Sequence, residues 1–237
     1  MDRAEHTAGE ARPPWPGDLS RWLFHYHRHM VAVPLRRAAP LRPVDPDDDF
    51  TIGEAFVRDF VHTWAPDILS FPLLSPRFCQ FLIDASDALG TWEPAEGDPY
   101  GAPEMRLDRI TPRLSTVVKT IVTLHVNPLF RRVFMGAYTA RAIETPFLIR
   151  YDMAAQQDMG LHMDGQSEVS LAIWLNHDYE GGGLRFPRQN CVVRQLPVGH
   201  ALMFLGGPTH MHEARPITAG VRRTLTIWTR SAEAPRR

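Results

Sequence analysis

Two segments in the second half of the sequence alternate between aliphatic and other side chains. In residues 169–176 every odd position is aliphatic, and the even positions carry small, polar or aromatic groups. In residues 221–228 the aliphatic side chains again share one parity, and the other parity holds Arg222, Thr224, Thr226 and Trp228. A period of two residues is that of a β-strand with two different faces. Both segments are therefore predicted to be strands whose aliphatic face joins a core and whose polar face lines a cavity.

A pair of facing antiparallel sheets accommodates such strands. Residues 68–74 and 146–151 have the composition of further short strands. Glycines suited to tight turns stand between the strand segments, at positions 181 to 183, 199, 206, 207 and 220. Two sheets of this kind facing each other form a double-stranded β-helix, a jelly-roll form. We predict an α+β, mainly β fold with a jelly-roll core and N-terminal helices packed on the major sheet.

Helical patterns precede the strands. Apolar residues at 56, 57, 60, 61 and 64 form a helical stripe. The next helix is predicted over residues 75–89, with Ser75 as N-cap and Pro76 in the first helical position. A third is predicted over residues 112–134, with an interruption near Pro128. The segment between these two helices, residues 91–105, is expected to be a surface connection or a flap over the site.

A metal site is indicated by three residues. His162 and Asp164 are two positions apart, and His212 lies fifty residues further on. On an extended strand His162 and Asp164 project from the same face and can share one ion. Two imidazoles and one carboxylate leave three positions open on an octahedral centre, as in non-haem Fe(II) oxygenases. His210 has the same parity as His212, so either could be the third ligand. Arg222 could clamp the distal carboxylate of a dicarboxylic co-substrate.

Three further histidines, His25, His27 and His29, alternate near the N-terminus. This region has the spacing of a helix, on which His27 faces away from the other two. A solvated or core-edge role is therefore predicted for them, rather than a second metal site.

Several longer motifs resemble one known family. The motifs are ILSFPLLSPRFCQFLIDAS, FLIRYD, HMD, WLNHDYEGGGLRFPRQNCVVRQLPVGHALMF and PTHMHEARPITAGVRR. Together they resemble the catalytic domain of procollagen-lysine 2-oxoglutarate 5-dioxygenases, and more broadly the prolyl 4-hydroxylase-type Fe(II)/2-oxoglutarate oxygenases. The resemblance covers residues 66–229. It implies an oxygenase domain over residues 66–230, an N-terminal extension over 1–65 that is partly disordered and then helical, and a disordered tail over 231–237.

The resemblance also implies residue roles. Fe(II) is held by His162, Asp164 and His212, and the C5 carboxylate of 2-oxoglutarate is bound by Arg222. His212 is preferred to His210 because its distance from Arg222 fits the family.

Three more residues are expected at the co-substrate. The resemblance places Tyr151 and Asn176 at positions that contact or border 2-oxoglutarate. Thr224 lies two residues after the arginine on the same strand face, so its hydroxyl can donate to the same carboxylate.

The resemblance implies an Fe(II)-, 2-oxoglutarate- and O2-dependent hydroxylase, with ascorbate as a candidate reductant. The expected reaction is hydroxylation of an unactivated C–H bond of an amino acid, small peptide or natural-product intermediate, with release of succinate and CO2. The alternatives are a peptidyl lysine or proline hydroxylase acting on a protein, and a non-oxidative cupin-like metal-binding protein. Four acids near the strands could meet a cationic amine or be solvated loop residues: Asp152, Asp158, Glu168 and Asp178.

Charge and composition argue against several other functions. A formal net charge of -1 offers no field to attract nucleic acid or an anionic membrane. No apolar run approaches the roughly 18 residues that span a bilayer, and the first 14 residues lack the basic and apolar parts of a signal peptide. A cytoplasmic location is therefore expected. Cys79 and Cys191 are far apart among apolar neighbours, which favours two buried thiols over a disulfide. The sequence predicts no oligomeric state.

Overall fold

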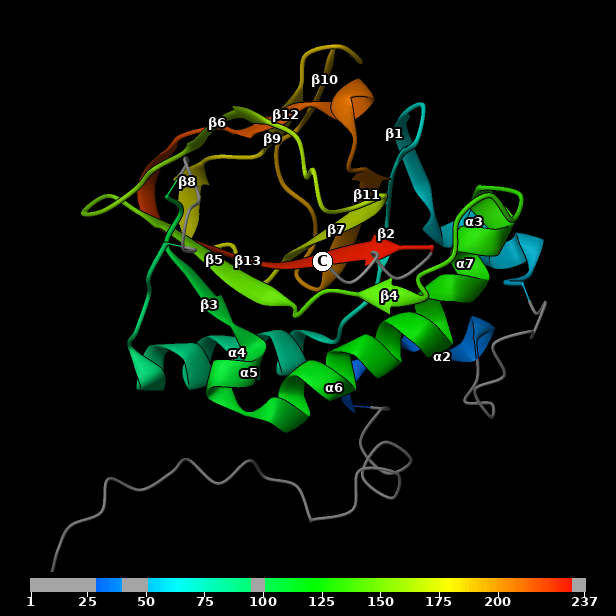
Figure 1. Cartoon of the computed structure of the whole chain (residues 1–237), viewed down its shortest axis with the longest axis horizontal. Coiled ribbons are helices and arrows are strands. Elements are labelled where there is room, and N and C mark those ends of the chain that lie inside the picture. The colour runs from blue at the N-terminus through cyan, green and yellow to red at the C-terminus, as the bar shows by residue number, and fades with distance from the viewer. Residues whose placement is uncertain (1–28, 40–50, 95–100, 232–237) are drawn as a thin grey trace, which may run out of the picture.

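The computed structural model describes residues 29–39, 51–94 and 101–231. Helical segments lie mainly in the first half of the described chain (Figure 1). They are α2 (Val33–Ala38), α3 (Glu54–Phe60), α4 (Pro76–Leu89), α5 (Leu107–Ile110), α6 (Pro112–Ile121), the π-helical turn η1 (Val122–Val126), α7 (Asn127–Val133) and the 3-10 turn η2 (Pro208–His210).

The strands form two antiparallel sheets. The major sheet runs in the order β1 (His62–Ala65), β2 (Ile68–Pro72), β11 (His200–Leu205), β7 (Val169–Trp174), β13 (Ile217–Arg230), β5 (Phe147–Asp152) and β3 (Glu104–Arg106). Two short strands also pair with β13, namely β4 (Ala142–Ile143) and β8 (Tyr179–Gly181). The minor sheet runs in the order β10 (Cys191–Val193), β9 (Leu184–Phe186), β12 (His212–Ala214) and β6 (Met159–His162). The predicted double-stranded β-helix is confirmed.

The two faces of the major sheet have different partners. Helices α4, α5 and α6 cover one face, and the minor sheet lies over the other (Figure 1). The aliphatic side chains of β7 and β13 belong to the core on the helical side: Val169, Leu171, Ile173, Leu225 and Ile227. The opposite parity of β7 supplies Ala172 and Trp174 to a second cluster between the sheets. The alternation read from the sequence therefore separates the two cores as predicted.

Helix α3 is shorter than the sequence pattern predicts. The apolar stripe continues to residue 64, but the helix ends at Phe60 and Val61 has extended backbone angles. Residues from His62 onward form β1, which pairs with β2 through a turn where Asp67 has a φ of 59°. Pairing with the sheet edge thus replaces the last helical turn.

The interruption predicted near Pro128 takes the form of a π-helical turn. Residues Val122–Val126 widen the helix immediately before α7, and Pro128 lies in the first turn of α7. Proline is tolerated there because the N–H groups of a first turn have no intrahelical partners. The helical path therefore changes geometry without breaking.

The N-cap predicted for α4 is present. The Ser75 hydroxyl accepts a hydrogen bond of 3.2 Å from the Phe78 N–H and donates to the carbonyl of His29. Replacing Ser75 with alanine is expected to lower the free energy of unfolding by about 1 kcal/mol, because an orphan helix donor loses its partner. Denaturant unfolding measures the loss. Ser75→Thr retains the hydroxyl and serves as control, so an equal loss in both variants would contradict the capping role.

The helices and strands on either side of residue 65 share one core. Leu35 and Phe56 pack in the same cluster as Phe78 of α4. The boundary at residue 65 stays a prediction. The expectations for residues 1–28, including His25 and His27, for the central part of the 91–105 flap and for the tail beyond residue 231 lie outside the described residues.

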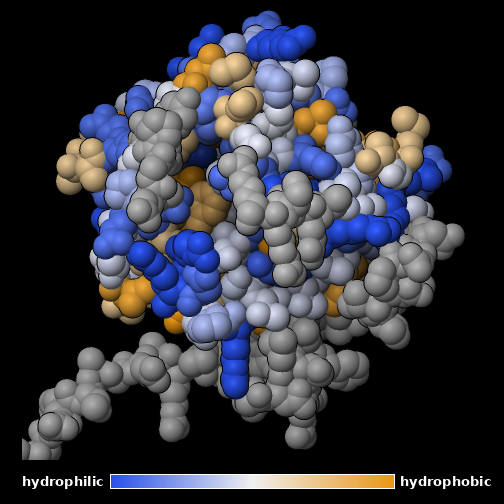
Figure 2. Space-filling model, viewed as in Figure 1, coloured by the Kyte–Doolittle hydropathy of each residue, from blue (hydrophilic) through white to orange (hydrophobic). Residues whose placement is uncertain are grey.

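The described surface and thiols have ordinary features. Cys79 and Cys191 are free and buried, as expected, and burial raises the pKa of Cys79 to about 12. The face seen in Figure 2 is mainly hydrophilic, with apolar residues in small separate groups. Among the described helices, none has the length and apolar character needed to cross a bilayer.

Candidate active site

Three ligand-bearing residues converge between the sheets. His162 ends β6 and His212 begins β12, and these two residues are paired in register. Asp164 follows β6 by two residues, just beyond the strand. One side-chain atom from each of the three lies within 4.8 Å of the others. The Asp164 Oδ1 is 3.8 Å from the Nε2 atom of each histidine. The structure therefore assembles the group whose spacing suggested a metal site.

Both imidazoles are oriented by backbone carbonyls. The Nδ1 atom of His162 is 2.8 Å from the Gly160 carbonyl, and the Nδ1 of His212 is 3.1 Å from the His210 carbonyl. A carbonyl oxygen only accepts hydrogen bonds, so each Nδ1 carries the proton. Each Nε2 atom is then unprotonated and has a lone pair on the side of Asp164. A histidine ligand binds a metal through such a lone pair.

The surroundings favour a neutral His212 beside a buried anion. Burial lowers the pKa of His212 below its usual value, although Asp164 acts in the opposite direction. The neutral form is the one that binds a metal. Asp164 is buried and, among the described residues, has no lysine or arginine partner. A divalent cation would supply the missing positive charge, and two imidazoles with one carboxylate suit Fe(II).

A cavity of about 460 Å³ opens beside the three residues. Its wall on the major sheet includes alternate residues of β13, namely Arg222, Thr224, Thr226 and Trp228, together with residues of β5, β7 and β11. The residues of β13 are those that the sequence pattern assigns to the polar face. The side chains of His162, Asp164 and His212 line the same cavity.

Arg222 is a buried cation that forms no ion pair with the described residues. Its side chain is 2% exposed and lies between the rings of Tyr151 and Trp174, whose centroids are 5.4 and 5.2 Å from the guanidinium carbon. One Nη1 hydrogen bond of 3.3 Å reaches the Gly183 carbonyl, and Nε has no partner. No acidic side chain of the described chain forms an ion pair with it. A carboxylate entering the cavity would satisfy this guanidinium.

Gly182 of the YEGGG motif packs against Tyr179 and lies beside Arg222. Gly182 has a φ of +71°, and a Cβ there would lie 3.2 Å from a Tyr179 ring carbon and 3.5 Å from Arg222 Cδ. Both the backbone angle and the crowding favour glycine. The YEGGG motif thus has a steric reason at this position.

Tyr151 and Thr224 line the cavity, and Asn176 does not. Tyr151 is paired with Arg222 in the β5–β13 register. Thr224 is 3% exposed and lies on the same face as Arg222. The Asn176 amide instead binds the backbone of Val221 and Arg223. Asn176 thus binds the strand that carries Arg222, and its expected place in contact with or bordering the co-substrate stays a prediction.

The structure brings His212, and not His210, to Asp164. The His210 ring lies 3.0 Å from the Thr209 hydroxyl and 3.2 Å from the Pro66 carbonyl, so it points away from the cavity. Its contribution is the backbone carbonyl that orients His212.

A matched pair of variants separates these two histidines. His212→Gln is expected to weaken metal binding by more than about 100-fold, because a ligand is lost rather than an outer partner. His210→Gln should leave metal affinity unchanged, because the orienting carbonyl belongs to the backbone. Metal titration followed by calorimetry measures both. Similar losses in the two variants would contradict the assignment.

None of the four acids weighed from the sequence lines the cavity. Asp152, for example, pairs with Arg150 at 3.0 Å and accepts from the N–H groups of Ala154 and Ala155. The cavity is lined instead by Glu104 and Glu144, together with Arg106. These residues lie on or next to strands of two or three residues, which are too short for a periodic pattern to identify.

Comparison with known proteins agrees with this geometry. The 2OG-Fe(II) oxygenase superfamily model matches residues 147–230. A Caenorhabditis elegans multifunctional procollagen lysine hydroxylase and glycosyltransferase is 33% identical over 169 residues, 66% of this chain and 23% of that protein. Procollagen-lysine,2-oxoglutarate 5-dioxygenase 1 of Rattus norvegicus is 31% identical over 181 residues, 71% of this chain and 24% of that protein. The chain thus spans about a quarter of the length of these relatives.

Solved structures share the fold. A viral collagen prolyl hydroxylase from Paramecium bursaria Chlorella virus-1, in complex with 2OG, superposes with a TM-score of 0.55 at 16% identity, covering 70% of this chain and 97% of that one. A Pseudomonas putida prolyl-4-hydroxylase gives 0.51 at 16% identity, covering 70% and 94%. Residues 147–230, which carry the three clustered ligands and Arg222, therefore identify this chain as one that contains a 2OG-Fe(II) oxygenase domain.

Proposed function

We propose that this protein is a hydroxylase that uses Fe(II), 2-oxoglutarate and O2 and releases succinate and CO2. The observation that carries the proposal is that one cavity is lined both by the His162, Asp164 and His212 cluster and by the unpaired Arg222 guanidinium. When bound, Fe(II) and 2-oxoglutarate would supply the chemistry by which O2 oxidises a C–H bond of the substrate.

The chain contributes binding and orientation. The two imidazoles and the Asp164 carboxylate would hold the metal from one side, leaving its other positions open to the cavity. Arg222 would bind the distal carboxylate of 2-oxoglutarate through its planar donors, and the Thr224 hydroxyl would donate to the same group. Trp174 lies behind the guanidinium, is fully buried, and helps to keep water away from it.

The proposed substrate is an amino acid, a small peptide or a natural-product intermediate. A cavity of about 460 Å³ falls within the range of small-molecule sites, roughly 300 to 1,000 Å³. A second candidate is a lysine or proline residue of a protein, because the relatives named above are procollagen lysine hydroxylases. A cytoplasmic location stays a prediction.

The decisive experiment measures succinate. Purified protein is incubated with Fe(II), 2-oxoglutarate, O2 and ascorbate, first alone and then with free amino acids, lysine- or proline-containing peptides and collagen-like peptides. Succinate formation coupled to a mass gain of one oxygen on one of these compounds supports the proposal and identifies the substrate class. A protein that binds the metal but forms no succinate under any condition would instead fit a cupin-like binding function.

A further inference from the structure

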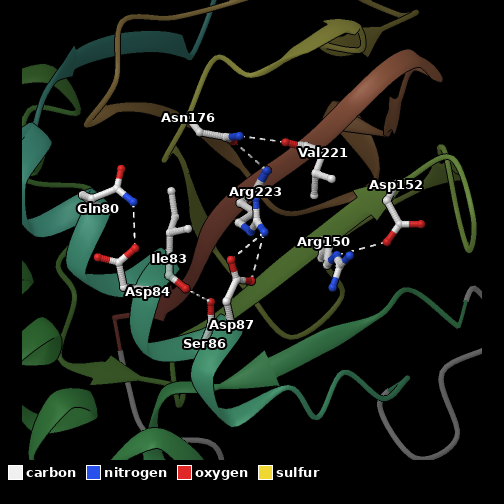
Figure 3. Close-up of polar contacts among 10 residues, drawn as sticks. All are labelled: Gln80, Ile83, Asp84, Ser86, Asp87, Arg150, Asp152, Asn176, Val221 and Arg223. Atoms are coloured by element: carbon white, nitrogen blue, oxygen red, sulfur yellow. Dashed lines mark hydrogen bonds and ion pairs between the residues drawn. The ribbon is translucent and has the colours of Figure 1, made fainter. Parts of the chain in front are cut away.

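The backbone pairing between β7 and β13 stops beside Arg222. The last paired residues in register are Trp174 and Thr224, and a final backbone hydrogen bond of 3.1 Å runs from the Leu175 N–H to the Arg223 carbonyl. Asn176, the residue after Leu175, continues the hydrogen bonding to β13 with its side-chain amide in place of its backbone. Its Nδ2 donates to the Val221 carbonyl at 2.7 Å, and its Oδ1 accepts from the Arg223 N–H at 2.9 Å (Figure 3).

These two hydrogen bonds bracket Arg222. They hold the residue before it and the residue after it, so the primary amide of Asn176 takes the place of a peptide group of a neighbouring strand. On the opposite edge, β5 pairs with the same stretch through Tyr151. Asn176 is 5% exposed, so water competes little for either hydrogen bond. The strand segment that carries Arg222 is therefore fixed from both sides.

A second anchor holds the outer side of the strand. Arg223 points away from the cavity, and its Nη2 lies 2.9 and 2.8 Å from the two carboxylate oxygens of Asp87 on α4 (Figure 3). The Asp87 side chain is 42% exposed, so this ion pair is expected to contribute little. The buried amide is the stronger of the two anchors, and Asp87 offers a matched control.

We propose that Asn176 is a positioning residue for 2-oxoglutarate binding, which acts by fixing the backbone on both sides of Arg222 and does not touch the co-substrate. The proposal rests on the function proposed above. The asparagine of the WLN motif would thus support the strand that carries Arg222, the residue that binds the distal carboxylate. It would have no part in metal binding.

Binding of two ligands distinguishes this role from a general structural one. Calorimetry is performed with the Mn(II)-loaded protein, using either 2-oxoglutarate or oxalate, which can chelate the metal but has no distal carboxylate. Asn176→Ala is expected to weaken 2-oxoglutarate binding about tenfold, as the loss of two buried hydrogen bonds would allow. Oxalate and Mn(II) affinities should be unchanged. Asp87→Asn should leave all three affinities unchanged.

A double-mutant cycle gives the second criterion. In an Arg222→Ala background, Asn176→Ala should cause no further loss of 2-oxoglutarate affinity, because the asparagine acts only through the arginine. An additional loss there, or an equal loss for oxalate, would overturn the proposal. If Asn176→Ala does not fold, Asn176→Ser, which keeps a hydroxyl on a shorter side chain, is measured by the same criteria.

Failure of the inference can be told apart from failure of the proposed function. A wild-type protein that binds Mn(II) but not 2-oxoglutarate overturns both. A wild-type protein that binds 2-oxoglutarate, with Arg222→Ala weakened and Asn176→Ala unaffected, overturns the role of Asn176 alone.

Discussion

Replacing Asp164 with alanine is expected to abolish Fe(II) binding and, with it, succinate formation. Asp164 is the only anion of the three clustered ligands, and its Oδ1 is equally distant, 3.8 Å, from both histidine Nε2 atoms. Its removal takes away one ligand and the charge that offsets the cation. Loss of an outer partner already weakens metal binding about 10- to 100-fold, so loss of this ligand should exceed about 100-fold.

Metal content after dialysis, metal titration and succinate release measure this effect. Asp158→Ala is the matched control, because Asp158 is an exposed acid in the loop before β6 and does not line the cavity. It should retain full metal content. An Asp164→Ala protein with normal iron content and full hydroxylase activity would remove the basis for the assigned site.

Arg222→Leu is expected to weaken 2-oxoglutarate binding at least about 30-fold while leaving metal affinity intact. Truncating one partner of a buried charged pair typically costs about 2 to 5 kcal/mol. Leucine still places an apolar side chain between Tyr151 and Trp174, so the two rings keep a packing partner. Arg222→Lys should restore only part of the affinity, because an ammonium keeps the charge but lacks the planar pair of donors.

The neighbouring arginine supplies the control. Arg223→Leu removes a half-exposed ion pair with Asp87 and leaves the cavity wall unchanged, so 2-oxoglutarate affinity should stay near that of wild type. Without ligand, Arg222→Leu should not lower the unfolding temperature, because it removes an unpaired buried charge. Equal effects of the two variants on 2-oxoglutarate binding would contradict the role of Arg222.

The alternation of side chains carried most of the fold prediction. It placed Ala172 and Trp174 between the sheets and Leu171 and Ile173 beneath the helices, because a strand buried on two sides needs two different apolar partners. The same parity turned Arg222 into the cavity. What the pattern could not provide was the end of each element. Helix α3 stops at Phe60 because the following residues pair with the sheet, a long-range event.

Sequence periodicity says least about the site where the chain leaves its strands. The parity of His162 was informative, but Asp164 lies beyond the end of β6, and a loop directs its carboxylate toward the histidines. Asn176 likewise follows the last residue of β7, and its role depends on how the two strands diverge. Glu104 lines the cavity because β3 pairs with β5, and Glu144 lines it from the position just after β4. Strands of two or three residues leave no periodic pattern in the sequence.

The clustered metal ligands and the carboxylate-binding arginine stand on different sheets, the former on or beside β6 and β12, the latter on β13. Phe186 of the minor sheet and Phe204 of the major sheet meet edge to face, with ring centroids 5.1 Å apart, and both rings pack against His212. A co-substrate that binds both to an ion held by the three ligands and to Arg222 would have to span the space between the two sheets. A five-carbon 2-oxo diacid is therefore expected to bind more tightly than a homologue one carbon shorter or longer.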